Sequence, residues 1–451
     1  MATLTVTNWF GDVVSHPQVV VEASSKEEII AILKDPVKYP SPVRAVGSNH
    51  STPPCGAADG GTLIKMTNMN NIVNISDQTV TAQAGAILVD VAHELEKRQM
   101  QFYVNTEIGS LSMGSAACAG TKDGSFFGEY GQVGSYLTEV EMILPSGEIL
   151  EVDESQPELL QQIRSSYGLF GIVTAATFRI RPILPMAVHH ETFKIPDFLQ
   201  KLPELWARNE SMMYYLFPFD DLITVEFRKY NPGASGSPNR IIWPLRNYMW
   251  ATAGPKFCYQ VDGEIADKTI RYGVIDSFCA LWRFKLENIV DSDNTVATDQ
   301  IIRYPKVSDD SRYTFSLWAF PEEQYATVLP AYVQFCKDYY QQKGYRTNML
   351  NVGYRISKDQ QSLLSYSYDG NVMTVDPVST ANPGWEDFLD AYNVFCAARG
   401  GKALLNQTAR LKRSQVQNSL GDRLKKFAAV RKTYDPGNRL LNSYFQDLLT
   451  Y

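Results

Sequence analysis

The chain has 451 residues, more than one simple hydrophobic core usually serves, so we expect two domains, or three at most. Hydrophobic residues make up 44% of the chain and charged residues 20%, which is typical of a globular protein. The net charge of −7, with no run of five or more basic residues, argues against a nucleic-acid partner.

Nothing at the N-terminus resembles a secretory signal, because MATLTVTNWFGDVV lacks a basic region followed by a long apolar one. No window of the chain holds the roughly 18 apolar residues that a membrane span requires. The six cysteines are scattered without a Cys-x-x-Cys pair, which favours free thiols in a reducing compartment. We therefore expect a soluble, intracellular protein without a membrane span.

Strand-like and helix-like patterns alternate over residues 1–185. A helix over 24–35 begins with a serine N-cap, Ser24 or Ser25, and carries acidic residues in its first turn. A Pro-Ser-Gly turn divides two alternating runs within 136–152, which predicts a β-hairpin. Further helices are expected over 87–99 and 158–168, and strands over 17–23, 41–47, 61–66, 78–86 and 171–182. This mixture predicts an α+β domain rather than a regular doubly wound sheet.

The pattern changes between residues 186 and 396, where aromatic-rich strands alternate with helices. Strands are expected over 212–219, 222–230, 312–320, 363–370 and 371–375, and a long helix over 322–344. We expect a second domain here, built on an antiparallel sheet. The remaining residues, 397–451, end in a helix, a Pro-Gly stop and a short amphipathic helix.

A histidine lies in a tight turn close to the end of a predicted strand. The turn reads AVGSNHSTPP (residues 45–54), and its His50 is one of only five histidines in the chain. A scarce imidazole among Gly, Ser, Asn and Pro residues is a candidate for a specific role.

A second loop, IGSLSMGSAACAGTKDGS (residues 108–125), consists almost entirely of small residues. Small residues let backbone N–H groups approach a bulky anion such as a pyrophosphate, so we favour a cofactor cradle over a flexible linker. The loop is neither a Gly-x-Gly-x-x-Gly motif that opens a helix nor a P-loop. A third glycine site, Gly168 and Gly171, precedes a strand and could equally be an ordinary turn.

Several ordered motifs together resemble the FAD-binding half of the vanillyl-alcohol-oxidase flavoprotein superfamily, nearest to its aldonolactone oxidase and alditol oxidase group. They are RAVGSNHS (44–51), GGTLIKMTNMNNIV (60–73), VTAQAGA (80–86), the small-residue loop and YGLFGIVT (167–174). MMYYLFPFDDLITVEFRKY (212–230) resembles the first cap segment of that group, and YDPGNRLLNSYFQDLL (434–449) its closing segment. The resemblance covers residues 8–185 and 400–449 well and is weak over 235–395.

The resemblance implies a PCMH-type FAD-binding domain of two subdomains over residues 1–185 and a cap, or substrate, domain over 186–396. Residues 397–451 would return to the interface between them. The position of His50 matches the histidine that bonds covalently to the flavin in many relatives, although a histidine that only hydrogen-bonds within its loop is the alternative. No cysteine occurs at 105–107, where some relatives carry a second tether, and Cys118 fits a small packed hydrophobe.

The resemblance also implies which residues contact FAD. Ile172 and Val173 would lie beside the adenine. One departure is the pair Lys122-Asp123, which stands where the group often has a histidine. Contacts with the pyrophosphate or the isoalloxazine are implied for Gly47, Ser48, Asn49, Ser51, Gly109, Ser112, Gly114, Ser115, Gly120, Gly124 and Ser125.

Four residues are candidates for catalysis. Lys402 matches the lysine of a His-Trp-x-Lys motif whose His-Trp pair is missing here, and it could instead be an exposed helix-end lysine. Gln407 lies in an Asn-Gln-Thr run suited to holding a hydroxyl group. Arg355 could orient the substrate and Tyr354 could accept a proton, although both could be ordinary strand residues.

We expect an FAD-dependent oxidase that transfers a hydride from a substrate CH–OH group to flavin N5, with molecular oxygen as acceptor and hydrogen peroxide as product. A dehydrogenase, or a natural-product tailoring oxidase for a bulky non-sugar substrate, is the alternative. A flavin reductase, a C–C bond-forming oxidase and a non-catalytic binding protein are also open. Aromatic residues expected in the cap suit a bulky small-molecule alcohol, or simply pack a core: Tyr214, Tyr215, Phe217, Phe219, Trp318, Phe320 and Tyr366.

Overall fold

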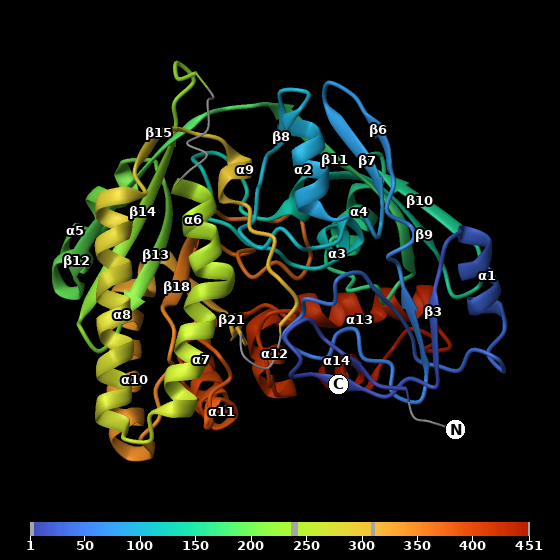
Figure 1. The fold of residues 1–451 in the computed structure, drawn as a ribbon. Coiled ribbons are helices and arrows are strands. Elements are labelled where there is room, and N and C mark those ends of the chain that lie inside the picture. The colour runs from blue at the N-terminus through green and yellow to red at the C-terminus, as the bar shows by residue number, and fades with distance from the viewer. Residues whose placement is uncertain (1–3, 236–241, 308–311, 450–451) are drawn as a thin grey trace.

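The computed structural model describes residues 4–235, 242–307 and 312–449 (Figure 1). A mixed α/β half contains the N-terminal part of the chain, and a second half is built on a large antiparallel sheet. The C-terminal helices lie against the N-terminal half, as the red and blue ribbons show in Figure 1. The predicted α+β class, with an antiparallel-sheet domain beside the FAD-binding domain, is confirmed.

A small parallel sheet opens the mixed half. Its strands follow the order β3 (Val19–Glu22), β5 (Thr62–Lys65) and β4 (Val43–Val46). Helix α1 (Lys26–Lys34) starts where predicted, because the Ser25 side chain accepts a hydrogen bond from the Glu28 N–H. A two-stranded ribbon, β1 (Val6–Thr7) and β2 (Val14–Ser15), carries Trp9 and Phe10 between its strands.

A six-stranded antiparallel sheet forms the rest of this half. The predicted hairpin is present as β9 and β10, and β11 lies at the centre of the sheet. The strands are β6 (Ile72–Ile75), β7 (Thr79–Gln83), β8 (Met100–Phe102), β9 (Leu137–Ile143), β10 (Ile149–Asp153) and β11 (Ile172–Pro182). The helices are α2 (Leu88–Glu96), α3 (Met113–Cys118) and α4 (Pro157–Ile163), with a 3₁₀ turn at Val133–Tyr136.

The second half contains an eight-stranded sheet in the order β15-β12-β14-β13-β18-β19-β17-β21. Both of its faces are covered, which explains why every residue of β13 is buried. Met213 and Tyr215 belong to one core cluster, and Met212 and Tyr214 to another. The strands are β12 (Met186–Lys194), β13 (Ser211–Phe217), β14 (Leu222–Tyr230), β15 (Ser292–Thr295), β17 (Trp318–Pro321), β18 (Asn351–Ile356), β19 (Val372–Val375) and β21 (Lys402–Ala403), beside a separate ribbon of β16 (Thr314–Phe315) and β20 (Val378–Ser379).

Helices pack on both faces of this sheet (Figure 1). One face meets α5 (Ile195–Ala207), α10 (Tyr325–Lys343) and α11 (Trp385–Ala397). The other meets α6 (Ile242–Tyr248), a π-helical segment (Met249–Ala253), α7 (Gly254–Glu264) and α8 (Lys268–Ile289). The short elements are α9 (Ala297–Gln300) and a 3₁₀ turn (Glu322–Gln324), and the C-terminal helices are α12 (Arg413–Leu420), α13 (Asp422–Tyr434) and α14 (Ser443–Leu449).

The strand predicted over 363–370 is wrong, because this segment forms turns. Its alternating apolar residues are buried between the two halves instead of in a sheet. Leu363 and Leu364 join the core of the N-terminal half, and the Tyr366 hydroxyl donates to the carbonyl of Thr121. The strand predicted over 312–320 is split into β16 and β17, which belong to different sheets.

No helix within the described ranges has the length and apolar character of a membrane span. The six cysteines are all buried as free thiols, as the scattered spacing predicts. Cys118 packs in the core, where its thiol donates to the carbonyl of Gly114.

Candidate functional site

Two adjoining cavities lie where the predicted motifs converge. The first is lined by the loops after β4 and β8 and by residues of the antiparallel-sheet half. The second is lined by β4, α3, the Tyr167–Gly171 turn and the start of β11. The two cavities form one continuous site, because they share six lining residues. The shared residues are Asn49, His50, Ser51, Ser112, Ser115 and Ala119.

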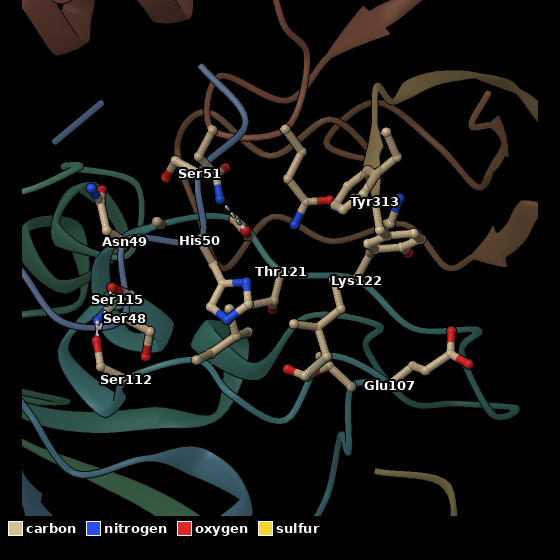
Figure 2. A pocket seen from close by; sticks show the side chains of 18 of the residues that line it. Ser48, Asn49, His50, Ser51, Glu107, Ser112, Ser115, Thr121, Lys122 and Tyr313 are labelled. Carbon is tan, nitrogen blue, oxygen red and sulfur yellow. Dashed lines mark hydrogen bonds between the residues drawn. The ribbon is translucent and has the colours of Figure 1, made fainter. Parts of the chain in front are cut away.

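His50 occupies the junction of the two cavities (Figure 2). Its ring stacks on Trp9 with 4.3 Å between centroids and meets Phe10 edge-on. Neither ring nitrogen has a hydrogen-bond partner among the described residues. Burial lowers the pKa of His50 to about 3, so the imidazole is neutral, with one ring nitrogen available as nucleophile or acceptor and the other carrying an N–H. A buried, unpartnered imidazole is costly unless something else bonds to it.

The small residues beside His50 are required by close backbone packing. A Cβ on Gly47 would lie 2.1 Å from Ser112 Oγ, and one on Gly114 would lie 2.8 Å from the Cβ of Ala84. Ser112 caps α3 by accepting from the Ser115 N–H, and Ser48 donates to the carbonyl of Ser110. In Figure 2 these serines lie on one side of His50, and Lys122 and Tyr313 lie on the other.

The second cavity holds the residues predicted beside the adenine. Ile172 and Val173 line it together with Gly168 and Gly171. Arg44 also lines it, and its buried guanidinium donates to the carbonyls of Cys55, Tyr167, Gly168 and Leu440. A buried positive charge held by carbonyls alone favours an anionic ligand nearby.

A buried ion pair stands in the wall of the first cavity. Lys122 donates to the Asp376 carboxylate, with side chains 8% and 0% exposed. Lys122 lies 5.0 Å above the Phe315 ring and 5.2 Å above the Tyr354 ring. Burial lowers the pKa of Lys122 and raises that of Asp376, so burial favours the neutral form of each group.

The rest of the first cavity combines aromatic walls with polar side chains, among them Thr106, Glu107, Asn406 and Gln407. Glu107 lies 2.7 Å from Arg246 and burial raises its pKa. Gln407 lines the cavity, and its side-chain oxygen is unpartnered within the described chain. The apolar walls come from Ile108, Leu111, Trp250, Tyr313, Phe315, Val352 and Tyr354.

Two of the four predicted catalytic residues do not reach this cavity. Tyr354 and Arg355 are neighbours on β18, and successive side chains of a strand point to opposite faces. Tyr354 lines the cavity, whereas the Arg355 Nε donates to Glu322 at 2.6 Å on the other face. Lys402 lies away from the cavity too, because its Nζ donates to the Ser419 carbonyl at 3.2 Å and lies 3.3 Å from Asp369.

Three predicted FAD contacts also lie outside the two cavities, for packing reasons. A Cβ on Gly109 would lie 2.2 Å from Ile301, and one on Gly124 would lie 2.8 Å from the carbonyl oxygen of Met212. The Ser125 hydroxyl accepts from the Ser357 N–H. These residues join the small-residue loop to the other half. The predicted contacts that line the cavities are Gly47, Ser48, Asn49, His50, Ser51, Ser112, Gly114, Ser115, Gly120, Ile172 and Val173.

In the sequence, Lys122 stands out only as a departure from the histidine that the family often has there, and no role was predicted for it. Asp376, Glu107 and Trp250 were not singled out, because no local pattern links residues so far apart in the chain. The signal that could have found Lys122 was a charged pair inside an otherwise small-residue loop. The aromatics expected to line the cap, such as Tyr214 and Trp318, are instead fully buried in the core.

Two family models together match most of the chain. Residues 17–153 match the FAD binding domain, and residues 176–448 match the D-arabinono-1,4-lactone oxidase family. The cofactor of the protein is accordingly FAD. The resemblance inferred from the motifs is confirmed.

Curated relatives of this chain are named as oxidases or dehydrogenases of sugar lactones. L-Gulono-1,4-lactone dehydrogenase of Mycobacterium tuberculosis is 24% identical over 48% of this chain and 50% of its own. D-Arabinono-1,4-lactone oxidase of Candida glabrata is 27% identical over 56% of this chain and 48% of its own. This chain therefore spans about half the length of these relatives. L-Gulonolactone oxidase of Scyliorhinus torazame is 20% identical over 97% of both chains.

Solved structures show the same fold over the whole chain. The cholesterol oxidase of Brevibacterium sterolicum superposes with a TM-score of 0.75 at 15% identity, covering 100% of this chain and 97% of its own. A solvent-stable cholesterol oxidase gives a TM-score of 0.75 at 15% identity, covering 99% and 98%. This likeness concerns the fold alone.

Proposed function

The chain belongs to the D-arabinono-1,4-lactone oxidase family, and on this premise we propose that it is an FAD-dependent oxidase of a substrate CH–OH group. Molecular oxygen is the acceptor and hydrogen peroxide the product. The cofactor-binding part comprises residues 1–185 with 397–451, and residues 186–396 form the substrate-binding part. His50 carries the proposal, because its two unpartnered ring nitrogens lie where both cavities meet.

The residues present fit FAD. His50 would be the residue that tethers the flavin covalently, since burial keeps its imidazole neutral and one ring nitrogen available for bonding. Backbone N–H groups at the start of α3 and in the turn around Asn49 would bind the pyrophosphate. Arg44 would add a positive charge, and Ile172 and Val173 would line the adenine site.

Bound FAD supplies a two-electron acceptor for the hydride of the substrate carbon. Lys122 takes up the hydroxyl proton at Nζ, because burial favours its neutral form, and Asp376 orients it. Gln407 and Tyr354 orient the substrate oxygen from the cavity wall. Arg355 and Lys402 drop out of the proposed catalytic set.

The lining of the first cavity indicates which class of alcohol is the substrate. The names of the relatives point to aldonolactones, whose several hydroxyl groups need several polar partners. The cavity offers such partners in Thr106, Glu107, Asn406 and Gln407, and its aromatic walls add an apolar surface that suits a bulkier and less polar alcohol. A dehydrogenase remains the second candidate, because one relative bears that name.

Acid precipitation of the purified protein tests the cofactor assignment. Wild type is expected to give a yellow pellet, because the flavin is covalently held. His50→Ala is expected to release its flavin into the supernatant, and absorbance of both fractions measures the partition. His16→Ala is the control, since His16 is exposed and distant from the cavities. A yellow pellet from His50→Ala would contradict the tether.

Substrate panels separate the candidate activities. We expect hydrogen peroxide release with apolar alcohols to exceed release with D-arabinono- and L-gulono-1,4-lactone. Flavin reduction without peroxide release in air would favour the dehydrogenase. No flavin reduction by any alcohol or lactone would contradict the oxidation of CH–OH groups.

A further inference from the structure

A third cavity shares one residue, Trp250, with the cavity beside His50. It lies among the π-helical segment, α7 and α8, and we call it the rear cavity. Because Trp250 lines both cavities, its ring is part of the wall between them. The rear cavity is lined by Met249, Trp250, Gly254, Cys258, Phe278, Cys279, Trp282, Met349 and Leu350.

The backbone at Trp250 is unusual for reasons that the sequence explains. The Gly254 N–H donates to the carbonyl of Met249, five residues earlier, which is the π-helical pattern. A Cβ at Gly254 would lie 2.8 Å from that carbonyl oxygen, so glycine permits the wide turn. Pro255 follows and has no N–H to continue the α-helical ladder. Such turns often occur at functional sites.

Ring contacts, and not hydrogen bonds, hold the Trp250 side chain. Its ring stacks on Tyr215 with 5.5 Å between centroids and meets Trp282 edge-on at 5.6 Å. The indole N–H is buried and has no hydrogen-bond partner in the described part of the chain. Turning the ring therefore breaks no hydrogen bond.

We propose that the ring of Trp250 divides one substrate site into two chambers, and that the rear cavity receives the apolar part of a bulky alcohol whose CH–OH group lies beside His50. The inference rests on the proposed function and names its substrate class. The rear lining contains thioether, thiol, aromatic and aliphatic groups and no charged side chain. Apart from the indole N–H groups of Trp250 and Trp282, this lining offers the hydroxyl groups of a sugar few partners, whereas it suits an alkyl group.

Binding of straight-chain primary alcohols, from ethanol to decanol, tests the proposal on the flavin-loaded protein. The dissociation constant is measured from the perturbation of flavin absorbance under anaerobic conditions. In wild type we expect affinity to increase about fourfold with each added methylene, up to decanol. The rise reflects burial of the growing alkyl chain in the rear cavity.

Two variants change the rear cavity in opposite ways, one by filling it and the other by opening it. Cys258→Phe fills the rear cavity and should abolish the gain in affinity for the longer alcohols while ethanol and butanol bind as before. Trp250→Ala removes the partition and should strengthen binding of decanol relative to butanol. Phe284→Leu is the control, because Phe284 lies on α8 but is 58% exposed. Cys258→Met gives a milder filling if the phenylalanine prevents folding.

A chain-length dependence that stops at butanol in wild type, or that Cys258→Phe leaves unchanged, would overturn the proposal. Peroxide release from the same alcohols is measured separately. Chain-length-dependent binding without any oxidation would support the two-chamber site and contradict the proposed oxidase activity. The two failures are therefore distinguishable.

Discussion

At the scale of single residues, Lys122 and Asp376 are the charged groups whose burial most needs an explanation. Removing two charges from water costs several kcal/mol per ion, and one ion pair does not always restore it. One oxygen of Asp376 lacks any hydrogen-bond partner among the described residues. A pair in this state at the wall of the cavity is better explained by chemistry than by stability.

Replacing Lys122 with Met is expected to lower kcat by a factor of about 10²–10⁴, the usual contribution of a general base. The methionine has a similar length but loses the ammonium group that lies over the Phe315 and Tyr354 rings. Steady-state kinetics measures the loss, and the flavin content of the purified variant shows whether the cofactor site is intact. Full activity in a flavin-loaded Lys122→Met protein would show that the base lies elsewhere.

Asp376→Asn provides the pH readout of the same assignment. Burial lowers the pKa of Lys122, and the Asp376 carboxylate opposes that shift. Removing the carboxylate charge therefore lowers the pKa further, and the neutral lysine forms at lower pH. We expect the rise of kcat/KM with pH to move to lower pH in Asp376→Asn. A shift in the opposite direction, or none, would contradict Lys122 as the base.

At the scale of elements, the sequence predicted correctly those helices and hairpins whose ends are marked by a local cap or turn. The serine cap of α1 and the Pro-Ser-Gly turn of the hairpin act within a few residues, and both are present. The segment 363–370 alternates like a strand, but it forms turns because contacts between the two halves bury it. No local signal distinguishes these two kinds of burial.

The candidate site was also predictable only in part: the cofactor loops were found from the sequence, and most of the substrate side was not. Small-residue motifs located the cofactor loops, since Gly47 and Gly114 are required where these loops pack closely against Ser112 and Ala84. The substrate-binding residues were harder to predict, because they depend on which face of β18 lines the cavity. Successive strand residues point to opposite faces, so either Tyr354 or Arg355 can line it, but not both. Asp376 and Trp250 join the site from elements far along the chain, which one sequence cannot reveal.

Contact between the His50 turn and the N-terminus of α3 gives a prediction for these two elements. Gly47→Ala would bring a Cβ within 2.1 Å of Ser112 Oγ, so we expect the loops to separate and the flavin content to fall. Adding Ser112→Gly removes the colliding side chain and should restore part of the flavin. The flavin-to-protein absorbance ratio measures both effects. Equal loss in the single and double variants would show that the collision is not the cause.

At the scale of the whole molecule, a buried charge network joins the small-residue loop of one half to the sheet of the other. Arg228 on β14 donates to Asp123 at 2.8 Å and to Glu226 at 2.6 Å. His190 on β12 lies 3.1 Å from Glu226 and 3.0 Å from Asp291. The loop that carries Lys122 is therefore held against the substrate-binding sheet by charged groups.

The protonation of His190 makes this junction depend on pH. Burial alone would lower the pKa of His190, but its hydrogen bonds with Asp291 and Glu226 raise it above the ordinary value of 6.5. A raised folded-state pKa means that the charged imidazole stabilises the fold fully below about pH 6.5 and that this contribution disappears as pH rises through the folded-state pKa.

Replacing His190 with Gln should therefore reduce the free energy of unfolding most at pH 6 and least at pH 9. The glutamine keeps a hydrogen-bonding group near Glu226 but carries no charge, so the difference isolates the ionic contribution. Denaturant titrations of wild type and variant at several pH values measure it. His189→Gln is the matched control, because His189 is the neighbouring residue on β12 and its side chain is 39% exposed. A loss of stability that grows with pH would mean that His190 is neutral in the fold and that Arg228 and Gln300 hold Glu226 without an ionic contribution from it.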